Sequence, residues 1–386
     1  MAKIQEIFLK FGQEFNGSKN MSYDQIKVFN SITKCKTKTL GSHIYTCNSC
    51  GEVVYSYNSC RNRHCPNCGD FKKEMWIESH NSNILDVSYY HVVLAIPDKL
   101  HKVFYHNKKV CYDLLLKAAS ETILELVSNP KYLSVTPGIV SMLHTWNQTG
   151  SYHPHVHLIV TGGGKTYHGT WKNVDAFLPI ELIEKYFKNK LILALKKANL
   201  LFYNEMEYLN DKDNLNVYLD NLLNITWLCY ARCPFEKVES VYKYLAKYVY
   251  KVWITNEKIK KINDKTVVFE YKDSKDRSNI KYMKIKGEEF IRRYLLHVLP
   301  KNFMKIRYYG LFAGRDKHKR MAYLRIITRT RKSKDKLLSK IELLNKINGF
   351  DVTKCKRCQG KFTLIKVIIP EKPPDNKENK RLANYA

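Results

Sequence analysis

One short segment with alternating histidines constrains the fold of this chain more than any other. It covers residues 153–160, and its alternation predicts a β-strand on which His155 and His157 point to one face together with Ile159. The other face is apolar, with Val156, Leu158 and Val160. Neutral imidazole is a common metal ligand, so the histidine pair predicts half of a metal site beside an apolar core. The alternative is a strand with incidental histidines.

A tyrosine pair later in the chain offers a possible nucleophile. Residues 242–250 have the position and flanks of a helix, on which Tyr244 and Tyr248 lie one turn apart on the same face. A tyrosine hydroxyl can attack phosphorus and form a covalent ester, and Lys247 could stabilise a phosphate or a leaving oxygen. Because the chain contains 27 tyrosines, a purely structural pair is the alternative.

Cysteine spacing predicts a zinc-binding module near the start of the chain. Two Cys-x2-Cys-Gly segments supply Cys47 and Cys50, then Cys65 and Cys68. Four thiolates at this spacing predict one tetrahedral, structural Zn²⁺ site with no open position for catalysis. A possible second zinc site comprises Cys35, His43, Cys60 and His64. Alternatively, Cys60 and His64 are packing or DNA-contact residues.

Charge indicates a polyanionic partner. The 386 residues include 66 Lys and Arg against 36 Asp and Glu, for a net charge of +30. The basic residues are interleaved with aromatic ones, which is typical of proteins that bind single-stranded nucleic acid. Arginines of the predicted zinc module and of residues 287–310 are candidate DNA contacts: Arg61, Arg63, Arg292, Arg293 and Arg307.

The remaining composition bears on the cellular compartment and on the size of the hydrophobic core. No apolar stretch approaches the roughly 20 residues that span a bilayer, and the first residues lack a signal-peptide core, so we expect a cytoplasmic, nucleoid-associated protein without membrane contact. Eleven cysteines in a reducing compartment favour metal ligands over disulfides. With 44% hydrophobic residues, the chain can bury a sizeable core.

Several motifs, in the same order, resemble one family. The histidine strand and tyrosine helix resemble the HUH superfamily of single-strand endonucleases, and the flanks resemble its two-tyrosine, rolling-circle insertion-sequence transposases, which carry a zinc domain at this place. The matching segments are residues 143–148 (LHTWNQ), 153–157 (HPHVH), 162–164 (GGG), 244–248 (YLAKY), 254–256 (ITN), 287–301 (GEEFIRRYLLHVLPK) and 306–310 (IRYYG).

The resemblance implies an α+β fold, in which a central antiparallel sheet flanked by helices carries the nuclease site. The corresponding domains are residues 1–70 (N-terminal helix and zinc-binding DNA recognition), 71–330 (HUH nuclease) and 331–386 (basic extension with a disordered tail). The extension contains a single Cys-x2-Cys segment, Cys355 and Cys358. These two cysteines either bind a metal together with ligands from elsewhere in the chain or bind no metal.

The family also implies a chemistry. His155, His157 and a third ligand would hold Mg²⁺ or Mn²⁺; Gln148 ranks slightly above His144 for the third place. Tyr244 or Tyr248 would nick single-stranded DNA at the element ends and rejoin it to target DNA through a 5′-phosphotyrosine. Because the sequence has no Walker loop, host replication or helicase functions are expected to separate the strands. The alternatives are a replication initiator or relaxase with the same chemistry, or a non-catalytic zinc-dependent DNA-binding protein.

Overall fold

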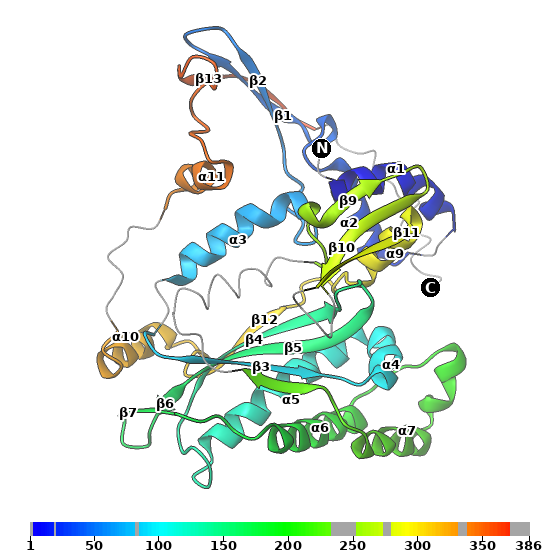
Figure 1. Ribbon diagram of the computed structural model, residues 1–386, viewed down its shortest axis with the longest axis vertical. Helices are drawn as coiled ribbons and strands as arrows, with labels where there is room; N and C mark the ends of the chain where they lie inside the picture. Colours follow the sequence, from blue (N-terminus) through cyan, green and yellow to red (C-terminus); the bar gives the residue numbers. More distant parts are fainter. Residues whose placement is uncertain are drawn as a thin grey trace.

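A computed structural model describes residues 3–18, 21–81, 85–232, 252–272, 279–330 and 338–370 (Figure 1). The predicted tyrosine helix, with Tyr244, Lys247 and Tyr248, lies outside the described residues.

The centre of the molecule is a five-stranded sheet in which every neighbouring pair is antiparallel. Its order is β12 (Ile306–Gly310), β4 (Gly138–Trp146), β5 (Tyr152–Thr161), β3 (Tyr89–Ala95) and β8 (Cys229–Arg232). The strand predicted around His155 is β5, in the middle of the sheet. The expected α+β fold with a central antiparallel sheet is therefore confirmed.

One face of the sheet carries the largest hydrophobic core. Helices α5 (Lys108–Ser128) and α6 (Ile180–Lys197) pack against each other beneath the sheet, with α4 (His101–His106) and α7 (Lys212–Asp220) beside them (Figure 1). Val156, Leu158 and Val160 of β5 are fully buried in this core, as their alternation predicts. A small hairpin, β6 (Gly163–Lys165) and β7 (Trp171–Asn173), follows the glycine run.

The opposite face carries a smaller core. Ile159 and Met142 pack with Leu324 of α10 (Lys317–Ile327) and Trp76 of α3 (Pro66–Asn81) in a smaller core. The histidine end of the same face lies beyond this core. The sheet therefore keeps a polar site and an apolar contact side by side on one face.

A second layer joins segments from both halves of the chain. Helices α1 (Lys3–Ser18) and α2 (Tyr23–Lys34) pack on α9 (Gly287–Leu296). They share a core with a three-stranded sheet, β9 (Ile259–Ile262), β10 (Thr266–Lys272) and β11 (Ile280–Lys286). The Phe8 ring, for example, meets the Tyr294 ring edge-on at 5.4 Å. Helices from the predicted N-terminal domain thus share a core with residues of the predicted nuclease domain.

A third sheet projects from the body of the molecule. It consists of β13 (Phe362–Ile368), β1 (Ser42–Cys47) and β2 (Val53–Tyr57), with β1 in the centre (Figure 1). Helix α11 (Lys340–Asn348) lies along α3 before the chain enters β13. None of the helices in the described ranges is both long and apolar enough to cross a membrane.

The turn between β4 and β5 contains a glycine at a position that has no room for a side chain. Gly150 has φ +79°, and an added Cβ would lie 2.3 Å from the buried indole of Trp253. Gly349 has a similar φ of +74° but no atom within 4 Å of such a Cβ. Both substitutions to alanine carry the cost of a left-handed backbone, but only that at position 150 adds a clash.

We therefore expect Gly150→Ala to destabilise the protein by about 1–3 kcal/mol more than Gly349→Ala, the usual cost of overpacking a filled site. Urea unfolding of the two variants beside the unmodified protein measures the difference. Equal losses in both variants would show that Trp253 can move aside.

Candidate active site and metal centres

Three histidines from two neighbouring strands meet on the face of the central sheet opposite the largest core. His144 of β4 lies directly opposite His155 of β5 in the strand register, and directly opposed residues point to the same face. His157 follows two positions later on that face. One ring nitrogen from each of the three lies within 4.8 Å of the others. The arrangement is a candidate metal site with three imidazole ligands.

The rings are oriented by contacts to their other nitrogens. Nδ1 of His155 donates to the carbonyl oxygen of His153 at 2.7 Å. Nδ1 of His157 lies 2.8 Å from Nε2 of His91, a buried histidine on β3. The Nε2 atoms of His155 and His157 therefore point toward each other and lie 3.1 Å apart. Such contacts fix the tautomer and direction of metal-binding imidazoles.

Burial keeps the His155 imidazole neutral. Removal from water, and secondarily the nearby His153, lowers the pKa of His155 to about 3. The imidazole is consequently uncharged at neutral pH, which is the form that binds a metal.

The two candidates for the third ligand lie in different places. His144 is buried, and its ring centroid is 4.2 Å from that of His157. Its ring lies close enough to His155 and His157 for the three to share one ion. Gln148, ranked slightly higher from sequence, lies in the exposed turn beyond a bulge that follows His144. Its role as a ligand stays a prediction.

Helix α9 and the residue after it hold the β4–β5 turn from outside. The His297 ring contacts the carbonyl oxygen of Gly150 at 3.1 Å and the hydroxyl of Thr145 at 3.2 Å. Arg293 donates to the carbonyl oxygen of Thr149 at 2.8 Å. These contacts give the 287–301 motif a role in positioning the end of the histidine strands.

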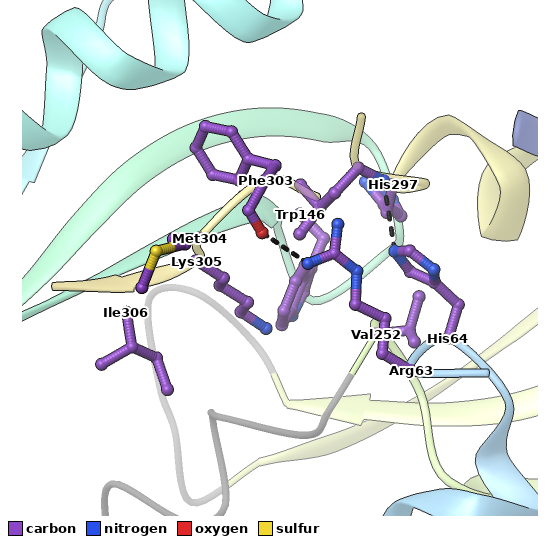
Figure 2. A pocket seen from close by; sticks show the side chains of 10 residues that line it. Arg63, His64, Trp146, Val252, His297, Phe303, Met304, Lys305 and Ile306 are labelled. Carbon is purple, nitrogen blue, oxygen red and sulfur yellow. Dashed lines mark hydrogen bonds between the residues drawn. The ribbon is translucent and has the colours of Figure 1, made fainter. Parts of the chain in front are cut away.

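A pocket of about 260 Å³ is lined by residues of several elements, among them Trp146, which follows the site histidine of β4 by two positions (Figure 2). Trp146 lines it and stacks on His144 with ring centroids 4.5 Å apart. The Lys305 ammonium lies 4.8 Å from the centre of the same indole. Arg63 and Phe303 also line the pocket. An aromatic ring with cations around it is suited to a nucleotide.

The arginines predicted to contact DNA differ in their availability. Arg61 is exposed, whereas Arg63 donates to the carbonyls of Pro300 and Phe303. The other three pair with acidic side chains: Arg292 and Arg293 with Glu289, and Arg307 with Asp113. Such pairing orients a guanidinium but leaves less of it free for phosphate.

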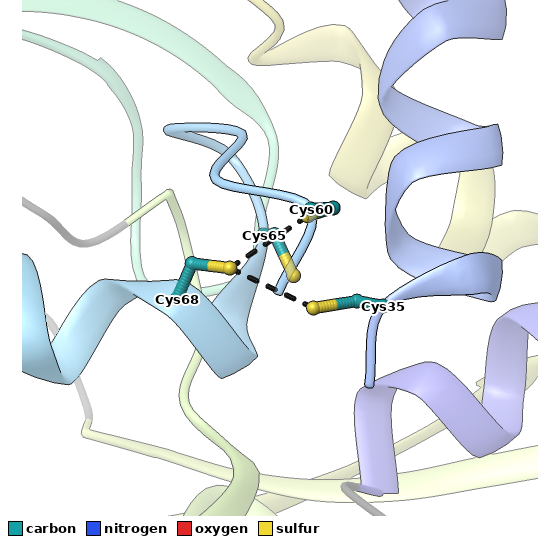
Figure 3. A group of neighbouring side chains, drawn as sticks. All are labelled: Cys35, Cys60, Cys65 and Cys68. Atoms are coloured by element: carbon teal, nitrogen blue, oxygen red, sulfur yellow. Dashed lines mark hydrogen bonds between the residues drawn. The ribbon is translucent and has the colours of Figure 1, made fainter. Parts of the chain in front are cut away.

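Four cysteines form a compact cluster between α2 and α3. They are Cys35, Cys60, Cys65 and Cys68, and their sulfur atoms all lie within 4.8 Å of one another (Figure 3). Cys35 and Cys60 have their sulfurs 3.6 and 3.7 Å from that of Cys68. Four thiolates at these separations are a suitable set for tetrahedral zinc.

The structure groups the cysteines differently from the sequence-based prediction. Cys47 and Cys50 are not with Cys65 and Cys68; they lie with Cys355 and Cys358 instead. His43 and His64 belong to neither group. His64 is buried, and its Nε2 accepts the backbone N–H of Leu299 at 3.2 Å, so it links the zinc-binding segment to the chain after α9. Equal Cys-x2-Cys spacing cannot tell which pairs converge.

Comparison with known proteins shows what kind of protein has this fold and these sites. Residues 7–96 match the family model described as "Transposase zinc-binding domain", and residues 138–320 match the model described as "Putative transposase". The second match spans β4, β5 and the 287–301 motif.

Two transposases are similar along most of their length. A protein of Sinorhizobium fredii named "Putative transposase y4qJ" is 34% identical over 331 residues, 84% of this chain and 83% of that one. The "Transposase for insertion sequence element IS801" of Pseudomonas savastanoi pv. phaseolicola is 26% identical over 296 residues, 75% of this chain and 71% of that one. Both family matches and both relatives define a DNA transposase with a zinc-binding domain. The chain belongs to this family of insertion-sequence transposases, as its motifs predicted.

The third ligand can be tested by metal binding. We expect His144→Ala to weaken Mn²⁺ binding by at least roughly 100-fold, because loss of a ligand should cost more than loss of a residue that only orients one. We expect Gln148→Ala to leave Mn²⁺ binding unchanged. Isothermal titration of the purified full chain measures both. The reverse order of effects would restore Gln148 as the ligand.

Because His91 orients a ligand and is not one itself, its removal should weaken Mn²⁺ binding less than the removal of His144. His91→Ala should weaken Mn²⁺ binding roughly 10- to 100-fold, because the His157 ring loses the partner of its Nδ1. His91→Gln, which can still form a hydrogen bond, should recover part of the affinity. His168→Ala on the exposed β6–β7 turn is the control. If metal affinity stays constant while only thermal stability falls, His91 is a packing residue.

Proposed function

We propose that this transposase nicks and rejoins single-stranded DNA through a 5′-phosphotyrosine intermediate during rolling-circle transposition. The observation that supports it best is the convergence of His144, His155 and His157 on one face of the sheet. A site for DNA chemistry needs such a cation-binding centre beside a surface that a strand can reach.

The histidines fit a divalent ion. Their donors are imidazole nitrogens that lie close together, and two of the rings are fixed by contacts to their other nitrogen. Mg²⁺ or Mn²⁺ would suit a phosphate site, and imidazole ligands favour Mn²⁺. When bound, the ion would polarise the scissile phosphate and offset its developing charge.

The proposed nucleophiles come from the sequence, because Tyr244 and Tyr248 lie outside the described residues. The hydroxyl oxygen of one tyrosine attacks the phosphorus and gives up its proton. The bond from phosphorus to the 3′ oxygen breaks, and that oxygen leaves as a 3′-hydroxyl after taking up a proton. The 5′ end stays on the enzyme as a phosphotyrosine ester, with Lys247 beside the phosphate.

A pair of tyrosines suits two successive cleavages. The second tyrosine would repeat the attack at the other element end or at the target, and a freed 3′-hydroxyl would then displace the tyrosine from phosphorus. Each step exchanges one phosphodiester for another, so the bond energy is kept and no ATP is needed. Strand separation would come from host replication or helicase functions.

Single-stranded DNA is the substrate that the described surface supports. The net charge of +30 attracts a polyanion, and Trp146 with Lys305 offers a stacking ring and a cation beside the histidines. A base next to the scissile phosphate could enter the 260 Å³ pocket.

The experiment is a denaturing-gel assay for a covalent protein–DNA adduct. Full-length protein is incubated with single-stranded DNA carrying the element ends, labelled 3′ of the expected nick, with Mn²⁺ or with a chelator of divalent ions. We expect a slow band with Mn²⁺ that is lost with chelator, in His155→Ala, and in the double variant Tyr244→Phe/Tyr248→Phe. The two single tyrosine variants rank the nucleophiles.

Matched controls use residues far from the chemistry. His168→Ala and Tyr167→Phe alter an exposed histidine and an exposed tyrosine of the β6–β7 turn and should keep the adduct. Cut DNA without an adduct would indicate hydrolysis instead of tyrosine transfer. Bound but uncut DNA with every end sequence would favour a non-catalytic DNA-binding protein.

A further inference from the structure

We infer that Cys47, Cys50, Cys355 and Cys358 form a second structural zinc site, which joins the beginning and the end of the chain. The four sulfur atoms lie within 4.8 Å of one another, although 305 residues separate Cys50 from Cys355. The zinc-binding family match ends at residue 96 and the transposase match at residue 320, so neither includes the second pair.

The sulfur separations fit tetrahedral zinc. Cys47 and Cys358 have their sulfurs 3.4 Å apart, and Cys50 and Cys355 have theirs 3.8 Å apart. Ligands at the usual zinc–sulfur distance of about 2.3 Å would be about 3.8 Å apart at tetrahedral angles. A disulfide needs about 2.05 Å, so the four thiols are placed as a metal set and not as two bridges.

Each cysteine pair sits in a tight backbone turn. Cys47 accepts the N–H of Gly51 at 3.0 Å and donates its own N–H to Glu52 at 2.9 Å. Cys355 likewise accepts the N–H of Gln359 at 2.9 Å and donates to Gly360 at 2.8 Å. Two such knuckles facing each other are the usual frame of a four-cysteine zinc site.

The knuckles also contact each other directly. Asn48 donates its N–H to the carbonyl oxygen of Lys361 at 3.0 Å, and Thr363 donates its hydroxyl to the side chain of Asn48 at 2.8 Å. A Cβ on Gly360 would lie 2.4 Å from the Ser49 hydroxyl oxygen and 2.9 Å from the Cys47 sulfur. Only a residue without a side chain fits this approach.

The projecting sheet needs such a link because it has little core. In β13 every residue except Phe362 is exposed, and in β2 only Tyr57 is not. Ile44 and Cys47 of β1 are the buried apolar side chains of this sheet. A small sheet with so few buried groups is marginal in water, and small modules of this kind usually depend on a metal or a disulfide.

The site would therefore be structural and separate from the first cysteine cluster. Four thiolates close the coordination shell and leave no position for substrate. Cys35, Cys60, Cys65 and Cys68 already form a complete set within residues 7–96. The expected content of the full-length protein is two zinc ions per chain.

The first test is zinc content. All proteins in this test carry His155→Ala, which removes the histidine site as a further zinc-binding group. The full-length parent, purified with zinc and then desalted, should carry two zinc ions per chain by elemental analysis. Added to this parent, the double change Cys355→Ser/Cys358→Ser should leave one, whereas Cys229→Ala, which removes a cysteine of β8 outside both clusters, should leave two. One zinc in the parent, or two after the double change, would overturn the inference.

The second test identifies which cysteines share an ion. Alkylation followed by mass spectrometry should show Cys47 and Cys50 reacting roughly tenfold or more faster in the double variant, because thiolates released from metal are nucleophilic. Cys35, Cys60, Cys65 and Cys68 should stay protected, which also shows that the protein remains folded. Continued protection of Cys47 and Cys50 would contradict the inference and support their pairing with Cys65 and Cys68.

A third variant covers the case in which the double variant does not fold. Cys358→His exchanges an exposed cysteine for another zinc ligand, giving a Cys3His set. It should keep two zinc ions and the protection of Cys47 and Cys50, whereas Cys358→Ala should lose one ion. Equal zinc content in these two variants would count against the site.

Discussion

The antiparallel register between β4 and β5 is the constraint on which the candidate active site depends. It sets His144 against His155, and the pleat then adds His157 to the same face and sends Val156 and Leu158 into the core beneath. Because the period of a strand is two, a slip of one residue would turn the histidines of β5 toward the apolar core and the core side chains toward the metal site. The site and the hydrophobic core therefore stabilise the same register.

Much of the remaining structure holds this register from outside. His91 of β3 contacts His157 from the neighbouring strand, and His297 and Arg293 hold the backbone of the β4–β5 turn. His64 links the zinc-binding segment to the chain after α9. The zinc-binding segment is thus packed against the element that positions the turn, and a disturbance of one should reach the other.

Thiol clusters bring together segments that are far apart in the sequence. The first cluster joins the end of α2 to the start of α3. The second would join β1 to the segment before β13, at the two ends of the described chain. A metal contributes most where a module cannot bury enough apolar surface to fold alone, and the projecting sheet, with both faces exposed, is such a module.

The sequence by itself determined the local patterns: the histidine strand with its apolar opposite face, the α+β class, the paired cysteines and the transposase family. These follow from short-range periodicity and motif order. Only the tertiary structure decided which groups meet, namely His144 opposite His155, and Cys355 and Cys358 as partners of Cys47 and Cys50. The physical reason is that the register of β4 and β5 is set by how their side chains pack on the core. The pairing of the cysteines is set by contacts between segments that are 305 residues apart, which spacing within each segment does not reveal.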